Sequence, residues 1–264
     1  MTKLKFLVFF LLVASFVTMQ AQVGVKLGGS LSKSGSYGNT EDGESADFKL
    51  GFQGGLFYNL NVSEKMDIMV ELNYESRGTV SKKDYMIGLP VQDPTTGTVL
   101  GIGNYSITQE ANSVQTYINL PILAVFGGEK FKYYVGPNVG FLLSGTAEFT
   151  RTIDITLGGN PAGTIKTDLE EVDWQDYDSF KNIFTTVPSE DGDFLNSVIV
   201  GINLGAMYSI SESMFVDLRV SQELTDSTND YYDDSIYPSD DFSFESRGDS
   251  DRNLSFQLSI GYKF

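Results

Sequence analysis

The chain has 264 residues and a formal net charge of -17, and it contains no cysteine and no histidine. This acidity disfavours nucleic acid as a partner, because affinity for nucleic acid depends on neutralising phosphates with lysine and arginine. The missing residue types exclude disulfides, histidine-ligated metal sites and catalysis through Ser-His or Asp-His pairs.

Residues 1–21 have the composition of a secretory signal peptide. Lys3 and Lys5 precede an apolar run over residues 6–17, and Ala21 is the small residue expected at a cleavage site. This run is too short for a stable membrane-spanning helix, and no later uninterrupted apolar segment approaches the roughly 18 residues that such a helix needs. We therefore predict a signal peptide at 1–21 and one exported domain at 22–264.

Eight segments of the exported domain alternate apolar residues with polar residues or glycine, which is typical of strands with two chemically different faces. In chain order they cover residues 23–31, 48–60, 66–80, 114–126, 131–144, 197–210, 214–223 and 253–264. Pro121 counts against the fourth segment, because proline removes a hydrogen-bond donor from a sheet. In the last segment every second residue from Leu254 to Phe264 is apolar.

The connections between these segments alternate in length. Those after the second, fourth and sixth segments are short, whereas those after the first, third, fifth and seventh are long and acidic. Outer-membrane barrels have short periplasmic turns, long extracellular loops and an even number of strands. We predict an all-β fold, an eight-stranded antiparallel up-and-down transmembrane β-barrel with long extracellular loops, located in the outer membrane. Residues 151–157 and 164–169 alternate around a glycine-rich turn, which leaves ten strands as an alternative.

The polar rows of the predicted strands are rich in glycine, which suits the narrow interior of an eight-stranded barrel. We therefore predict that the apolar rows face lipid and the polar rows face the lumen, with a soluble ligand-binding barrel of the opposite arrangement as the alternative. Charges of both signs in the polar rows predict a paired lumen network, because isolated buried charges are costly. Its predicted members are Lys26, Lys49, Asp67, Glu71, Glu75, Arg77, Lys132, Asp217 and Arg219. Aromatic residues near strand ends suit an interfacial girdle, and they are Phe131, Tyr133, Tyr208, Phe215, Tyr262 and Phe264.

Residues 116–145 read TYINLPILAVFGGEKFKYYVGPNVGFLLSG, which is a strand of the form Y-x-x-I/L-P-x-L, a tight turn and then G-P-x-x-G-x-L-L. This hairpin resembles the central hairpin of the PorT-like outer-membrane β-barrel family of Bacteroidetes. The glycine-containing region 49–60, the E-L-x-Y-x-x-x-G at 71–78 and the terminal G-Y-K-F resemble the same family. The resemblance implies an outer-membrane barrel, and some relatives assist protein secretion. The long acidic insertions of this chain depart from the family pattern.

Two clusters of acidic and aromatic residues fall in the predicted long loops. In the first, Trp174 and Tyr177 are candidate contact residues, and the weak candidates for holding a divalent cation are Asp173, Asp176 and Asp178. In the second, the candidate contact residues are Tyr231, Tyr232 and Tyr237. The competing interpretation is a solvated acidic surface without a ligand, which is the usual state of such loops.

No paired-acid arrangement stands out, so we predict a non-enzymatic protein without a cofactor. Its predicted role is structural or surface-binding through the acidic aromatic loops. The alternatives are an accessory component of protein secretion across the outer membrane and a soluble ligand-binding barrel. The predicted partners are outer-membrane lipid, a partner outside the cell or in secretion, and the barrel-insertion machinery, whose signal the C-terminal aromatic Phe264 resembles.

Overall fold

The computed structural model describes residues 22–34, 44–92, 95–157, 159–168, 172–173, 195–227 and 252–264, so the predicted signal peptide lies outside the described residues. The strands are β1 (Gln22–Ser34), β2 (Glu44–Ser63), β3 (Met66–Gln92), β4 (Val99–Gly127), β5 (Phe131–Leu157), β6 (Asn160–Asp168), β7 (Val172–Asp173), β8 (Val198–Ser209), β9 (Met214–Glu223) and β10 (Asn253–Lys263). Within the described ranges, no helix is long and apolar enough to cross a membrane.

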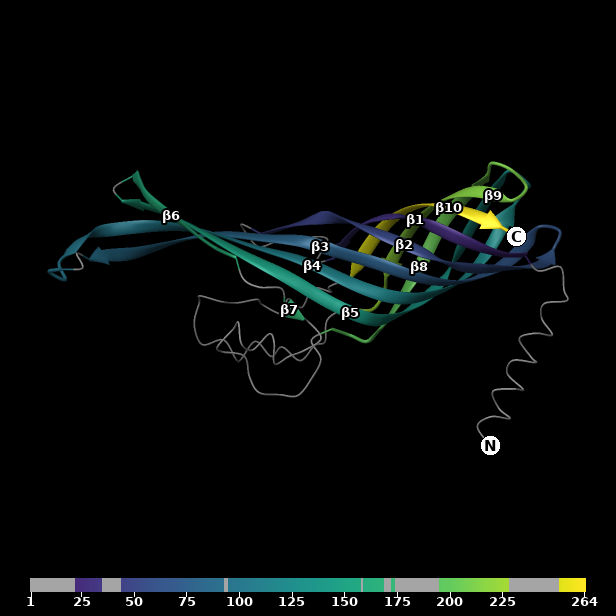
Figure 1. Cartoon of the computed structure of the whole chain (residues 1–264), viewed down its shortest axis with the longest axis horizontal. Coiled ribbons are helices and arrows are strands. Elements are labelled where there is room, and N and C mark those ends of the chain that lie inside the picture. Colours follow the sequence, from purple (N-terminus) through teal and green to yellow (C-terminus); the bar gives the residue numbers. More distant parts are fainter. Residues whose placement is uncertain are drawn as a thin grey trace, which may run out of the picture.

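The strands close into a ring by antiparallel pairing (Figure 1). The pairings run from β1 through β2, β3, β4, β5, β8, β9 and β10 and return to β1. Among the described residues, β6 and β7 pair only with β5. The ring therefore passes through eight strands, and the β5–β6 hairpin that suggested ten strands lies outside it. A closed ring pairs the backbone groups that an open sheet edge would leave unsatisfied in hydrocarbon.

One end of the ring carries the short connections. They join β2 to β3 after Ser63, β4 to β5 after Gly127 and β8 to β9 after Ser209. The first residues of β1 and the last residues of β10 pair with strands at this same end, where Figure 1 marks the C-terminus. We call it the turn end.

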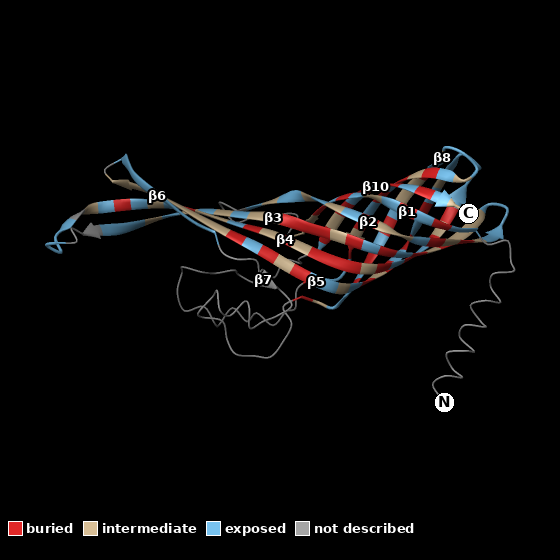
Figure 2. Ribbon diagram, viewed as in Figure 1, coloured by how far each residue is buried: buried red, intermediate tan, exposed pale blue. Residues whose placement is uncertain are grey.

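Buried and exposed residues alternate along the strands of the ring (Figure 2), and the two faces have the predicted polarity. Side chains of the apolar rows point outward, so Leu27 is 71% exposed and Leu50 is 75% exposed. Side chains of the polar rows point inward, so Lys26 is 4% exposed and Glu71 is 1% exposed. The prediction of outward apolar rows is confirmed, and the alternative of a soluble barrel with an apolar interior is wrong.

Three strands are much longer than their alternation predicted. β3 continues to Gln92, β4 begins at Val99 and β5 continues to Leu157, whereas the sequence patterns ended at 80, began at 114 and ended at 144. These extensions and β6 form a sheet that projects beyond the ring, away from the turn end (Figure 1). We call it the projecting sheet; it comprises residues 84–92, 99–110, 148–157 and 160–168.

The polarity of the strand rows is reversed in the projecting sheet. The row of β5 that carries Tyr133, Val135 and Phe141 on the outside of the ring is continued, past an irregularity, by Glu148, Thr150, Thr152 and Asp154. The opposite row becomes apolar, with Phe149 buried and Ile153 and Ile155 half-buried. The irregularity is a register shift at which Tyr117 pairs with Leu142 and Thr116 with Ser144, as at a β-bulge. The outward apolar belt therefore ends near this bulge.

Candidate functional site

Glu71 is the centre of the largest group of charges in the lumen. Its carboxylate accepts hydrogen bonds from Lys26 Nζ at 2.9 Å and from Arg219 Nη1 and Nη2 at 2.9 and 2.8 Å. Asp217 pairs with the same two cations, at 3.0 Å to Lys26 and 3.4 Å to Arg219. The Tyr134 hydroxyl accepts a hydrogen bond from Arg219 Nε at 2.9 Å and donates one to Asp217. Two cations and two carboxylates thus neutralise each other where all four side chains are almost fully buried.

A second group surrounds Arg77 on the side away from the turn end. Its guanidinium pairs with Glu223 and with Glu75 and lies over the Tyr117 ring, 4.6 Å from the centroid. Glu75 also accepts hydrogen bonds from Asn119 and Gln257, and Glu223 accepts one from the backbone N–H of Asn253 at 2.9 Å. Every oxygen of the two carboxylates therefore has a donor, as buried charges require.

The structure divides the predicted lumen residues into four groups. Lys26, Glu71, Asp217 and Arg219 form one, and Glu75 and Arg77 belong to the second. Lys132 pairs with Asp67 at 2.6 Å near the turn end, and Lys49 donates to Asn112 and to the carbonyl of Ser113 at the other end. Sequence reasoning missed Glu223, Tyr134 and Asn119, although each occupies a polar row of its strand. The alternation along each strand was a signal that these residues face the lumen. Which of the inward side chains contact each other depends on the register between strands.

Between the Glu71 group and the turn end, the lumen is filled by an apolar layer. Its buried members are Phe57, Met69, Leu123, Val125, Tyr134, Met207 and Phe215. Phe57 and Phe215 meet edge to face with ring centroids 5.4 Å apart. The expectation that Phe215 belongs to an interfacial girdle is therefore wrong, because Phe215 is 2% exposed and packs in the apolar layer of the lumen.

Glycines on neighbouring strands make room for these rings. Gly24 pairs with Phe57, Gly261 with Phe215 and Gly205 with Tyr134. A Cβ atom at Gly261 would lie 2.1 Å from the Phe215 ring, and one at Gly205 would lie 2.3 Å from the Tyr134 ring. Each of these three aromatic rings thus covers a glycine on the adjacent strand, where any side chain would displace the ring.

Replacement of Gly261 with valine should destabilise the barrel by about 1–3 kcal/mol, the usual cost of overpacking a filled core. The measurement is urea unfolding of the detergent-refolded protein, followed by heat-modifiable gel mobility. Gly163→Val is the control, because no atom lies within 4 Å of a Cβ at Gly163 on β6. Adding Phe215→Ala should suppress part of the Gly261→Val defect through coupling of neighbours. Strict additivity of the two changes would contradict this packing.

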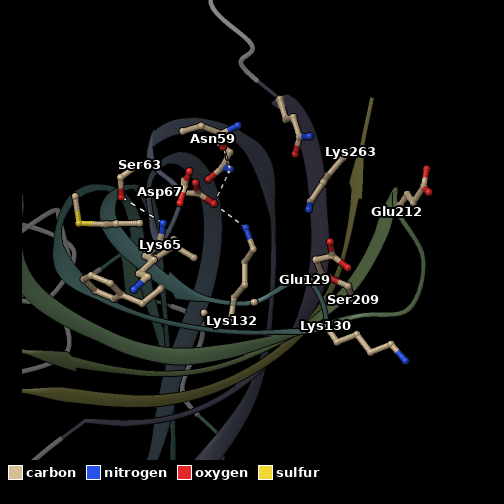
Figure 3. A pocket seen from close by; sticks show the side chains of 18 of the residues that line it. Asn59, Ser63, Lys65, Asp67, Glu129, Lys130, Lys132, Ser209, Glu212 and Lys263 are labelled. Atoms are coloured by element: carbon tan, nitrogen blue, oxygen red, sulfur yellow. Dashed lines mark hydrogen bonds and ion pairs between the residues drawn. The ribbon is translucent and has the colours of Figure 1, made fainter.

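A cavity of about 810 Å³ opens at the turn end. The apolar layer closes its inner side, where Phe57, Met207 and Phe215 border a narrow extension of the cavity. Figure 3 shows Asp67 and Lys132 joined across the cavity and Lys263 reaching into it from β10. The lumen is therefore a plugged interior with a blind recess at the turn end.

Most of the loop candidates fall outside the part of the chain that the structure describes. Trp174, Asp176, Tyr177, Asp178, Tyr231, Tyr232 and Tyr237 lie outside the described residues, and the side chain of Asp173 is not described. Across the described ranges, no group of three or more acidic side chains is arranged to hold a metal ion.

Charged and hydroxyl side chains make up most of the outward face of the projecting sheet, where Met86 and Ile102 are exposed apolar exceptions. The Asp84 carboxylate accepts a hydrogen bond from the Thr108 hydroxyl at 2.6 Å and pairs with Lys82 at 3.1 Å. The hydrogen bond from Thr108 is the largest cause that holds the pKa of Asp84 below its ordinary value, and the hydrogen bond from Lys82 lowers this pKa further. This face is therefore suited to water.

Comparison with solved structures finds other barrels at low similarity. Ail, the attachment invasion locus protein of Yersinia pestis, is 11% identical, with 93% of this chain and 100% of that chain covered and a TM-score of 0.37. Neisserial surface protein A is 11% identical, with coverages of 92% and 99% and a TM-score of 0.35. OprG from Pseudomonas aeruginosa is 13% identical, with coverages of 93% and 97% and a TM-score of 0.35. A comparison with curated proteins finds no match.

A family model described as outer membrane protein beta-barrel domain matches residues 18–229, which is most of the chain. The closed antiparallel ring, its outward apolar rows and its charged interior agree with that match. The chain therefore belongs to the outer membrane protein beta-barrel domain family and is a protein of the outer membrane.

Proposed function

We propose that this barrel is a non-enzymatic surface-binding protein that engages an extracellular partner through the projecting sheet and the long acidic loops. The turn end would face the periplasm, in keeping with the short turns of outer-membrane barrels. The observation that carries the proposal is the continuation of β3, β4 and β5 well past the end of the outward apolar belt. A barrel that needed only to span the membrane would have no use for these extensions.

The free edge of β3 is the best-defined contact surface on the projecting sheet. β2 pairs with β3 only as far as Lys83, so among the described residues the stretch 84–92 pairs with β4 alone. This edge reads DYMIGLPVQ, with one charge and with Met86 68% exposed. Exposed edges of soluble sheets are usually blunted by charges, and an apolar edge is a template for another strand. We propose that an extended polypeptide segment adds to this edge.

Two double variants test the edge in the full-length protein held in lipid nanodiscs. Met86→Lys with Gly88→Lys places two charges on the edge strand, and Ser106→Lys with Asn104→Lys places them at the paired positions of β4, one strand inward. The probe is a biotinylated ten-residue peptide of alternating threonine and valine. We expect saturable binding that weakens at least about tenfold in the first variant, because charges at an edge oppose strand addition. Equal binding by both variants would sink the proposal.

The aromatic residues Trp174, Tyr177, Tyr231, Tyr232 and Tyr237 are proposed as additional contacts of the same partner, because tyrosine and tryptophan supply contact area with a polar group. We also propose outer-membrane lipid as the surroundings of the apolar belt and the barrel-insertion machinery as a partner during assembly. Alanine replacement of Trp174 alone should weaken capture of a partner once one is identified, without changing the heat-modifiable mobility.

Membership of the PorT-like family, and with it a secretion role, is a second candidate. It is supported by the hairpin at 116–145, whose inward residues Tyr117, Asn119 and Asn138 are buried in the lumen. Because these residues pack inside the barrel, a structural need accounts for the hairpin motif. The motif is therefore better support for membership of the family than for a role in secretion. If the second candidate is right, crosslinking in whole cells followed by purification of the barrel should recover periplasmic secretion components. If no secretion component is recovered, the surface-binding role is favoured.

A further inference from the structure

We propose that the turn-end cavity binds the C-terminal carboxylate of a polypeptide, with the ammonium of Lys263 as its main ligand. This site lies at the opposite end of the barrel from the projecting sheet, and it does not depend on the surface-binding role.

At the inner end of the cavity, Lys132 has an ion-pair partner, whereas Lys263 makes no ion pair among the described residues. The Lys263 side chain is half-buried, and within the described residues its ammonium makes no hydrogen bond or ion pair; it lies 5.7 Å from the centroid of the Phe215 ring. Lys132, by contrast, pairs with Asp67 at 2.6 Å, and the same carboxylate oxygen accepts a hydrogen bond from Asn59 at 3.3 Å. A partly desolvated ammonium without a partner is unfavourable, and a bound anion would supply a charge-assisted hydrogen bond.

The charges at the inner end of the cavity favour an anion of single charge. Lys132 and Lys263 face only Asp67 there, which leaves one positive charge uncompensated. The remaining charges of the lining are three acidic residues, Glu64, Glu129 and Glu212, and two basic residues, Lys65 and Lys130, all of them exposed and in the turns at the mouth of the cavity. Figure 3 shows Glu212 and Lys130 directed away from the cavity centre. A carboxylate matches this single free charge better than a doubly charged phosphate monoester does.

The inner wall of the cavity indicates what accompanies the carboxylate. Lys263 lies beside the narrow extension that Phe57, Met207 and Phe215 border, and Asn59 and Ser209 also line it. In the main cavity an apolar side chain would contact Met66 and Ile210, while the amide of Asn59 and the hydroxyl of Ser209 would contact peptide N–H and C=O groups. The chemistry therefore fits a polypeptide terminus that ends in an apolar residue.

Calorimetric titration of the full-length protein in nanodiscs tests this site. The probes are N-acetyl-Gly-Gly-Leu with a free carboxylate, the same peptide as its amide, and inorganic phosphate. We expect the free acid to bind saturably and the amide and phosphate to bind at least about tenfold more weakly, which corresponds to about 1.4 kcal/mol. Equal binding of acid and amide would overturn the proposal.

Three variants assign the binding to Lys263. Lys263→Met should weaken binding of the free acid at least about tenfold, because it removes a charge-assisted hydrogen bond. Lys263→Arg should retain binding, which separates loss of the charge from loss of the fold if the methionine variant refolds poorly. Lys166→Met on β6 removes the same charge from an exposed position and should bind like the parent protein. Undiminished binding by a folded Lys263→Met variant would exclude Lys263 as the ligand.

Discussion

Replacing Glu71 with glutamine should lower the free energy of unfolding by about 3–5 kcal/mol, the range found when one partner of a buried ion pair is removed. The change keeps the shape of the side chain but leaves Lys26 and Arg219 with only Asp217 as a counter-ion. Urea unfolding of the refolded barrel, followed by gel mobility, measures the loss. Few single substitutions in this chain should have a larger effect.

Two controls separate this electrostatic cause from general damage. Glu64→Gln removes the same charge from an exposed turn and should change stability by less than about 0.5 kcal/mol. Adding Lys26→Met to Glu71→Gln restores equal numbers of charges around Arg219 and Asp217, so the double variant should regain part of the loss. A double variant less stable than Glu71→Gln would argue against charge balance as the organising feature of this group.

Leu258→Arg should destabilise the inserted barrel by about 2–4 kcal/mol, as expected for arginine on the lipid face near the membrane midplane. Leu258 is in the middle of β10, is 55% exposed and pairs with Leu218 on β9, which is 57% exposed. The measurement is refolding and unfolding in lipid vesicles, since detergent adapts to an added charge more easily than a bilayer does.

The matched control for Leu258→Arg is Ser106→Arg, which lies in the outward row of the projecting sheet. It should change stability by less than about 0.5 kcal/mol, because that row is polar and would stand in water. Similar losses from the two substitutions would show that the outward apolar belt continues further along the strands than their polarity indicates.

The alternation of residues was sufficient to predict the ring strands and the direction of their faces. It failed for residues 99–113, because the sequence rule that assigns apolar residues to the outward row no longer holds past the end of the outward apolar belt. In that stretch the apolar residues Ile107 and Ala111 are buried, while Ser106 and Glu110 are exposed. Within one strand, the apolar residues change from one face to the other. A search for one continuous alternation of apolar and polar residues then finds no strand and assigns a loop.

The interior was only partly predictable for a different reason. Phe57 interrupts its row in the sequence, and its place in the lumen makes sense only because Gly24 is directly opposite on β1. Lys263 occupies a polar row as expected, but its lack of a counter-ion depends on Lys132 and Asp67, which come from β5 and β3. Such contacts are set by register between strands distant in sequence, which composition and spacing do not contain.

The pairing of β1 with β10 has a consequence for the order of assembly. This seam joins residues about 230 positions apart, from Gly24 with Lys263 to Ser34 with Asn253, and nothing else in the ring can substitute for it. Contacts between residues so far apart in sequence form slowly. The entropy of the long intervening chain is lost before the contact contributes any favourable energy. The cylinder can therefore become continuous only after its final strand is available, and until then two unpaired margins must be shielded from other chains.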